Sequence, residues 1–494
     1  MDWNQKRVKL AATLLGGLLI VWTASEVLAC TTAVISGAAT VSGRPLLWKN
    51  RDRSVEDQEV VYFNDGLYPY VTITNAGDST QAWGGANTTG FAIEDANNWN
   101  TFDPSGPNDD GTIIKLALQT CVTVDDFQDI LDSTSVVGHT EPAIFGVIDA
   151  FGGASMFETF EHSYVRYDAD DPEDAPLGVL VRANWSYAGS TTGRLGVYRH
   201  NRSKDFIEGA AEGDTLDLHF MLQTVMRDLH PETGFDPYPL PTQTQFGSMP
   251  LGWTSTYGAI CRRLSVSGLV VEGILPDEDP LLTTCWIIPM AEQYGVALPF
   301  WVAAGETPAT VNGDSTAPLS DEGLRLKAFA QHATGFHDSL DTYVLYDGLG
   351  GGLRMTTFPL EDYVLARAYD SLDVWRSQGV DGATMGSLTT ALADSVYAVL
   401  SQWPRPGDSM LPPQPIADLT IKLAAGAGLV LNWSAVTTNT HDLPVEGVEY
   451  SIWRYDELPG TGTELFLDRI TDTEFTIPEQ EISERAFFEV RVEI

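Results

Sequence analysis

The apolar segment near the N-terminus decides where the folded part of this chain can begin. Residues 1–9 carry three basic side chains, residues 10–23 form an apolar run, and small residues close the segment at Ala29. This order is typical of a secretory signal peptide, and the run is too short to span a bilayer comfortably. We therefore expect cleavage after Ala29, export to the periplasm or medium, and a mature chain that begins with Cys30.

The residues that follow Cys30 have the pattern of an antiparallel hairpin. Residues 31–36 and 44–49 are typical of strands, and the small and glycine-rich residues 37–43 supply the turn. A hairpin of this length returns the stretch "WKNRD", which holds Lys49 and Asp52, to the side of Cys30.

The remainder of residues 30–403 alternates between strand and helix patterns. Further strands are expected within residues 60–74, 142–160 and 177–186. Helices are expected over residues 110–133, with a break near Thr123, and over residues 321–347, 360–379 and 385–403. The mixture predicts an α+β domain whose strands pair in antiparallel fashion.

A proline-rich run at residues 404–415 divides the chain. Beyond it, residues 416–494 contain short strands at sandwich spacing, and Trp433 stands where a buried sandwich tryptophan is expected. This stretch resembles a fibronectin type III module. The expected domains are a signal peptide (1–29), an α+β domain (30–403), a linker (404–415) and a β-sandwich (416–494), which is a candidate for contact with a cell surface or polymer.

The chain carries 68 acidic and 28 basic residues, a formal net charge of −40. Such a surface repels nucleic acid and anionic lipid, so neither is an expected partner. No later run is apolar enough to predict a membrane span. The eight histidines, His332 and His337 among them, show no metal-ligand spacing, so no metal or cofactor is expected.

Four cysteines leave room for disulfides in an exported protein. They are Cys30, Cys121, Cys261 and Cys285. If Cys30 is reactive, one pair at most remains, and Cys261 with Cys285 is the expected pair.

An N-terminal cysteine places a nucleophile and a base on one residue. Its free α-amine titrates near pH 7.7–8.0 and is able to take the thiol proton without a histidine. Acyl transfer also needs donors for the tetrahedral oxyanion and charged groups that hold the amine and thiol. The hairpin that returns residues 49–52 to Cys30 suits this chemistry.

The stretch "CTTAVISGAATVSGRPLLWKNRD" resembles the start of the N-terminal nucleophile (Ntn) amidohydrolases related to choloylglycine hydrolase, penicillin V acylase and the C45 acyltransferases. Those begin with Cys-Thr and carry Arg-Asn-x-Asp on the next strand. Asp52 matches the family aspartate, whereas Lys49 stands where arginine is usual, and Arg51 is an alternative for that role. The resemblance implies a four-layer αββα sandwich.

Three further segments resemble the same family and imply site residues. "WGGANTTGFAIEDANNWN" implies Asn97, or its neighbour Asn98, at the oxyanion hole, and "VLVRANWS" implies Asn184. "AICRRLSVSGLVVEG" implies Arg262, with Arg263 as the alternative.

Together these features predict an exported cysteine Ntn hydrolase that cleaves the C–N bond of a small N-acyl amide through a thioester on Cys30, or passes the acyl group to another amine. Its expected site residues are Cys30, Lys49, Asp52, Asn97, Asn184 and Arg262. One alternative is a C69-type dipeptidase, which also begins with cysteine. The other is a non-catalytic lipoprotein or adhesin, because Val-Leu-Ala-Cys resembles a lipobox in which Cys30 carries a lipid.

Overall fold

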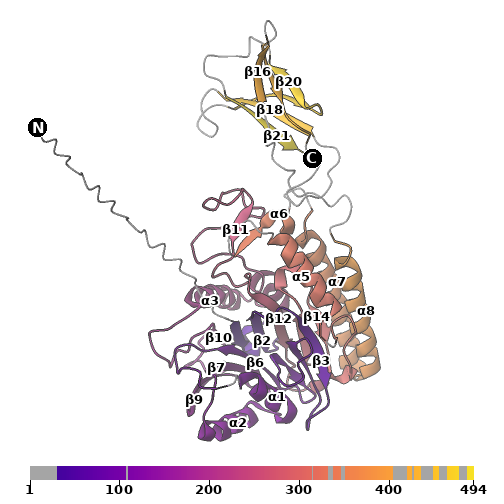
Figure 1. The fold of residues 1–494 in the computed structure, drawn as a ribbon. Helices are drawn as coiled ribbons and strands as arrows, with labels where there is room; N and C mark the ends of the chain where they lie inside the picture. The colour runs from indigo at the N-terminus through magenta and orange to yellow at the C-terminus, as the bar shows by residue number, and fades with distance from the viewer. Residues whose placement is uncertain are drawn as a thin grey trace, which may run out of the picture.

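A computed structural model gives the fold of the chain (Figure 1). It describes residues 30–106, 109–313, 315–331, 338–346, 351–403, 420–424, 428–435, 449–455, 464–477 and 487–493. The expected signal peptide, the linker at 404–415, and His332 and His337 lie outside the described residues.

The first sheet contains the predicted hairpin as two of its interior strands. Its order is β10-β1-β2-β12-β13-β14, and every pair is antiparallel. The strands are β1 (Thr31–Ile35), β2 (Leu46–Asp52), β10 (Val179–Arg182), β12 (Ser265–Glu272), β13 (Thr284–Ile288) and β14 (Leu298–Phe300). All residues of β1 and β2 are buried, because this sheet is covered on both faces.

The second sheet is a seven-stranded antiparallel meander in sequence order. It comprises β3 (Gln58–Phe63), β4 (Tyr70–Asn75), β5 (Gly84–Asn87), β6 (Ala92–Asn97), β7 (Ala143–Ile148), β8 (Ala154–Phe160) and β9 (Ser163–Asp168). The two sheets pack face to face. A Cβ added to Gly146 would lie 2.9 Å from both Leu47 and Val34 of the first sheet, so this close approach requires glycine.

Helices cover the outer face of each sheet (Figure 1). The second sheet is covered by α1 (Asp110–Thr120) and α2 (Val124–Val137), and Thr123 caps α2 in a reciprocal box with Asp126. The first sheet is covered by α3 (Val197–Glu212), α5 (Pro318–Ala330), α7 (Arg354–Gln378) and α8 (Gly382–Leu400). The expected αββα layers are therefore confirmed.

Shorter elements complete this part of the chain. They are η1 (Gly37–Ala39), α4 (Leu218–Phe220), the π-helical η2 (Met221–Val225), β11 (Trp253–Ser255), η3 (Pro280–Leu282), η4 (Glu292–Tyr294), η5 (Val302–Ala304), β15 (Ser339–Asp341) and α6 (Thr342–Leu345). In the described part of the chain, no helix is both long and apolar enough to cross a membrane.

Two expectations are corrected by the structure. The helix expected over residues 321–347 ends at Ala330, and β15 intervenes because its backbone pairs with β11. The expected disulfide is also wrong, since all four cysteines are buried free thiols. Cys261 instead donates from its sulfur to Glu292 Oε2 at 3.2 Å, whereas Cys285 lies within β13.

The C-terminal strands form two further three-stranded sheets, β16-β17-β20 and β19-β18-β21. Their bounds are β16 (Thr420–Ala424), β17 (Gly428–Asn432), β18 (Glu449–Tyr455), β19 (Glu464–Ile470), β20 (Glu474–Ile477) and β21 (Phe487–Glu493). Trp433 is buried, and its ring lies 5.2 Å from that of Tyr450. Assignment to the fibronectin type III class, and the domain boundaries, remain predictions.

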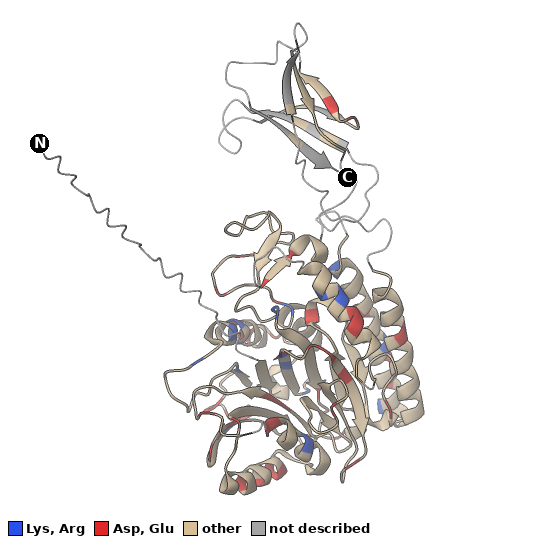
Figure 2. Cartoon of the chain, viewed as in Figure 1, with Lys and Arg blue, Asp and Glu red and all other residues tan. Residues whose placement is uncertain are grey.

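Charged residues have two kinds of location in the α+β domain. Figure 2 shows that acidic residues lie along α2, where Asp125, Asp129 and Asp132 are exposed to solvent. A second set of charges is buried where β1 and β2 meet, and that set surrounds Cys30.

Candidate active site

Cys30 immediately precedes β1 and is 1% exposed. The register of the hairpin sets Thr31 opposite Asn50 and Thr32 opposite Lys49. The structure thus confirms that the hairpin returns residues 49–52 to the side of Cys30. Because β1 is flanked by β10 and β2, the candidate nucleophile extends from an interior strand rather than from an edge.

Asp52, at the end of β2, accepts hydrogen bonds from three buried or half-buried donors. Arg262 Nε and Ser265 Oγ each lie 2.8 Å from a carboxylate oxygen, and Arg199 Nη1 lies 3.4 Å away. Three donors, two of them cationic, thus satisfy the oxygens of this buried carboxyl group.

The structure separates the two adjacent arginines that the sequence left as alternatives. Arg262 reaches Asp52, whereas Arg263 forms an ion pair with Asp338, with Nε 3.3 Å from the carboxylate. The geometry therefore brings Arg262, and not Arg263, into the cluster around Cys30.

Arg199, on the first turn of α3, is a member of this cluster that the sequence analysis missed. Its Nη1 donates to Cys30 O at 3.2 Å, to Thr31 Oγ1 at 3.1 Å and to Asp52. Its Nη2 donates to Asn184 Oδ1 at 3.0 Å. One guanidinium thus joins Cys30, the aspartate and the candidate oxyanion asparagine.

Burial and the nearby charge of Arg262 together lower the pKa of Arg199 to about 10, and Asp52 opposes this shift. A pKa of this size keeps the guanidinium charged at neutral pH. The side chain is therefore a permanent donor that cannot accept a hydrogen bond.

Asn184 lies just beyond β10 and meets the main chain of Asn97. Its Nδ2 donates to Asn97 O at 2.9 Å. The side chain of Asn97 points elsewhere, since its Nδ2 donates to Glu141 Oε1 at 2.9 Å. The alternative, Asn98, donates to Ser186 Oγ at 2.5 Å. Asn97 thus meets Asn184 through its backbone.

Lys49 points between the two sheets. It forms a buried ion pair with Asp95 of β6 and donates to Trp83 O at 2.9 Å. Arg51, the alternative on the same face of β2, contacts Gln58 and donates to Asn75 Oδ1 at 3.0 Å. Lys49 is the one of the two that is tied to a carboxylate.

The thiol of Cys30 lies on the side of β2 that faces the second sheet. Burial raises the pKa of Cys30 above its usual range; Lys49 and Arg53 oppose this shift, whereas Asp95 and Asp52 add to it. The net result is a thiol that stays protonated at neutral pH, so nucleophilic attack requires a base.

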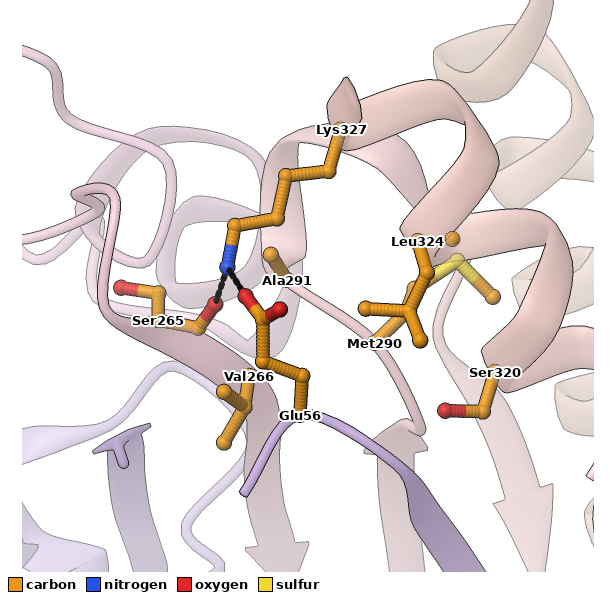
Figure 3. A pocket seen from close by; sticks show the side chains of 9 residues that line it. Glu56, Ser265, Val266, Met290, Ala291, Ser320, Leu324 and Lys327 are labelled. Atoms are coloured by element: carbon orange, nitrogen blue, oxygen red, sulfur yellow. Dashed lines mark hydrogen bonds and ion pairs between the residues drawn. The ribbon is translucent and has the colours of Figure 1, made fainter. Parts of the chain in front are cut away.

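A small pocket adjoins the cluster at Ser265 (Figure 3). Lys327 Nζ lies 2.6 Å from Glu56 Oε1 and 3.1 Å from Ser265 O, while Met290 and Leu324 form the apolar side. Cys30 does not line this pocket, so we do not assign it to the substrate. Among the described residues, no His, Cys, Asp and Glu side chains gather in a metal-binding group.

The sequence pattern of residues 197–212 only weakly indicates the helix α3. Its buried residues keep helical spacing, but Arg199, His200 and Ser203 occupy the first two turns where apolar residues would reveal a helix. Its N-cap is Gly196, which has φ +72° and offers no capping side chain. A polar buried face and a glycine cap conceal both the helix and its functional arginine.

No family model matches the chain, and no curated protein sequence matches it. Among solved structures, it is similar to two variants of conjugated bile acid hydrolase from Clostridium perfringens, each 12% identical. One has a TM-score of 0.32 over 53% of this chain and 89% of that chain, and the other 0.33 over 55% and 92%. Penicillin V acylase from Agrobacterium tumefaciens is 12% identical, with a TM-score of 0.32 over 55% of this chain and 85% of that chain. At this distance, functional assignment rests on the residues around Cys30.

Proposed function

We propose that this chain is an exported cysteine Ntn hydrolase that cleaves the C–N bond of a linear amide through a thioester on Cys30. One observation carries the proposal: Cys30, Asp52 and Asn184 are joined through Arg199 in a single hydrogen-bonded network at the N-terminal end of β1. This arrangement holds a nucleophile, a carboxylate beside its main chain and an amide donor within one buried cluster.

The general base in this proposal is the α-amine of Cys30. In the full chain, the Cys30 nitrogen belongs to the peptide bond with Ala29 and has no basicity. Cleavage of that bond releases an amine that titrates near pH 7.7–8.0. Asp52 lies beside this end of the chain and is suited to orient the amine, which takes the proton from the thiol.

The thiolate sulfur attacks the amide carbonyl carbon, and the C=O electron pair moves onto oxygen. Asn184 Nδ2 is the proposed oxyanion donor. When the C–N bond breaks, the α-ammonium returns its proton to the leaving nitrogen, and a thioester remains on Cys30. Water then attacks the thioester, releasing a carboxylic acid and the free thiol; an amine acceptor in place of water makes a new amide instead.

The substrate class follows from the charge of the protein. A formal charge of −40 disfavours anionic amides in the surrounding solution. Arg262 and Arg263, two of the cations that the sequence singles out, are paired with Asp52 and Asp338. We therefore propose small neutral or cationic N-acyl amides as substrates.

For the C-terminal strands we propose a separate role, namely attachment of the protein to a cell surface or polymer.

The chemical state of Cys30 tests this proposal. Intact mass of the exported protein should begin at Cys30 with no lipid. An electrophile should label that residue alone, because burial raises the pKa of Cys121, Cys261 and Cys285 and none of these three thiols has a free α-amine beside it to act as a base. Cys30→Ala should abolish amide hydrolysis, and Cys30→Ser should retain a trace. Cys121→Ala is the matched control and should retain activity. A lipidated Cys30 would support the lipoprotein alternative.

A variant with one alanine inserted before Cys30 tests the role of the α-amine separately from that of the thiol. Its thiol is intact, but the amine is displaced by a peptide unit, so we expect a loss nearly as large as that of Cys30→Ala. Normal turnover by this variant would show that the amine is not the base. A substrate panel of N-acyl amides and dipeptides separates the proposal from the dipeptidase alternative.

A further inference from the structure

The amide group of Asn184 lies between two partners that each allow one hydrogen-bonding role. We propose that Arg199 is a positioning residue that fixes the orientation of the Asn184 amide and thereby directs its N–H toward the oxyanion. This inference rests on the function proposed above.

The argument begins with the two partners. Arg199 Nη2, 3.0 Å from Asn184 Oδ1, is able only to donate. Asn97 O, 2.9 Å from Asn184 Nδ2, is able only to accept. Rotating the amide by 180° would set NH2 against the guanidinium donor and oxygen against the carbonyl acceptor, so both contacts would become repulsive. Only one orientation of the amide satisfies both contacts.

This orientation determines what Asn184 offers to a substrate. One of its two amide N–H groups is used by Asn97 O, and the second remains for the oxyanion. In the opposite orientation, the group facing the reacting carbonyl would be an acceptor oxygen, which repels the developing negative charge. The guanidinium therefore selects the catalytic form of the amide without touching the substrate.

Arg199 also sets the distance between Asn184 and the nucleophile. The same guanidinium contacts Cys30 O, Thr31 Oγ1 and Asp52 at 3.1–3.4 Å. Four acceptors on three separate segments are thus held by one planar group. A lysine ammonium has no such planar fork and cannot reproduce this set of contacts.

The backbone beside the guanidinium gives independent support. A Cβ on Gly196 would lie 2.4 Å from Arg199 Nη2 and 3.1 Å from Ala183. Gly196 also has φ +72°, a conformation that glycine adopts without strain. The chain therefore leaves space at this position for the terminal nitrogen that contacts Asn184.

The test uses the processed full-length enzyme and compares Arg199→Met with Arg202→Met. Loss of an oxyanion donor costs about 100- to 1,000-fold in kcat, so we expect Arg199→Met to lose about 100-fold in kcat with KM changed less than about 3-fold. Arg202 lies on the same helix and pairs with Asp228 at 2.5 Å. Arg202→Met should retain kcat within about 2-fold.

Two measurements distinguish loss of the Asn184 orientation from a general disruption of the site around Cys30. Alkylation of Cys30 by iodoacetamide forms no oxyanion, so its rate in Arg199→Met should stay within about 3-fold of wild type. Adding Asn184→Ala to Arg199→Met should cost little more, because both changes remove one function. Multiplicative losses, or an unchanged kcat in Arg199→Met, would overturn the inference.

Arg199→Lys provides the test if Arg199→Met does not fold. Lysine retains the charge near Asp52 but not the paired contacts, so we expect about a 10-fold loss of kcat; wild-type kcat would overturn the inference. Failure of the proposed function gives a different result, namely wild-type enzyme without amide hydrolysis or full activity in Cys30→Ala.

Discussion

Charged side chains on the two faces of β2 lie near Cys30, and the sign of the central charge differs between the faces. Toward α3, Asp52 is an anion held by the cations Arg199 and Arg262. Toward the second sheet, Lys49 is a cation held by the anion Asp95. The first arrangement contacts the main chain of Cys30, and the second influences its thiol.

This contrast indicates how one strand serves two reactive groups on a single residue. Successive β2 side chains alternate between faces, so Asp52 and Lys49 are directed to opposite sides of the sheet. We expect the Asp52 side to determine turnover, because it lies where cleavage would release the α-amine. We expect the Lys49 side chiefly to determine stability, because its ion pair lies in the interior between the sheets.

The largest expected effect is that of Asp52→Asn. The variant keeps the size of the side chain but removes the negative charge that Arg199 and Arg262 contact, and the released amine loses its proposed anionic partner. We expect kcat to fall by about 1,000-fold, or about 4 kcal/mol. Steady-state kinetics on wild type and variant measure the effect, with both proteins fully cleaved between Ala29 and Cys30.

Asp95→Asn is the matched control on the opposite face, and its loss of kcat should be at least about 10-fold smaller. Equal losses in Asp52→Asn and Asp95→Asn would show that the two faces of β2 do not differ in function.

The next effect concerns stability. Lys49→Met leaves Asp95 buried without its cation, which typically costs about 3–5 kcal/mol in the free energy of unfolding. The double variant Lys49→Met/Asp95→Leu removes both charges and should recover most of that loss. Denaturant unfolding measures both proteins. A Lys49→Met variant as stable as wild type would contradict a structural role for this pair.

A pH-dependent effect should arise at Glu94, which accepts from Thr32 between the sheets. Burial raises the pKa of Glu94 to about 8 from an ordinary value of 4.5. The folded protein therefore binds the proton more tightly than the unfolded chain. Its stabilising contribution is full below about pH 4.5 and is lost as pH rises through about 8.

The glutamine side chain in Glu94→Gln does not ionise, so this variant should not show this loss of stability as the pH rises. Between pH 5 and pH 8, the unfolding free energy of wild type should decline by about 1–3 kcal/mol more than that of the variant. Thermal melts across this range measure the difference. The exposed control Glu161→Gln should follow the wild-type profile, and parallel profiles for Glu94→Gln would refute the assignment.

The smallest effect is expected from removing the C-terminal strands. The residues that contact Asp52 and Lys49 on the two faces of β2 all precede residue 403, so a chain ending at Gly407 should retain kcat within about 2-fold. Turnover of a soluble amide by the folded, shortened protein checks this. A large loss would place part of the site, or part of its support, beyond the predicted linker.

Local patterns explain what was predictable from the sequence. The β1–β2 hairpin follows from apolar runs on either side of a glycine-rich turn, and α2 follows from its capping residue Thr123. Asp52 and Arg262 were predicted through family resemblance, and the structure brings them to 2.8 Å. Their pairing joins segments that are distant in the sequence.

The parts that were missed depend on contacts between distant segments. Asp95 lies on a strand of the other sheet, so nothing near Lys49 in the sequence identifies its partner. Arg199 lies on a helix whose buried face begins with polar side chains. Hydrophobic periodicity detects cores, and it fails where a helix buries a charge for use in a site.

Gly196 has a consequence for anyone who transfers this site to another scaffold. The position supplies no atom to the network, yet an alanine there would occupy the space of Arg199 Nη2. A graft that copies only the side chains around Cys30 would omit it, and the arginine would be displaced although every polar group had been retained. The smallest set of residues that can be transferred with the site therefore includes Gly196, whose contribution is that it has no side chain.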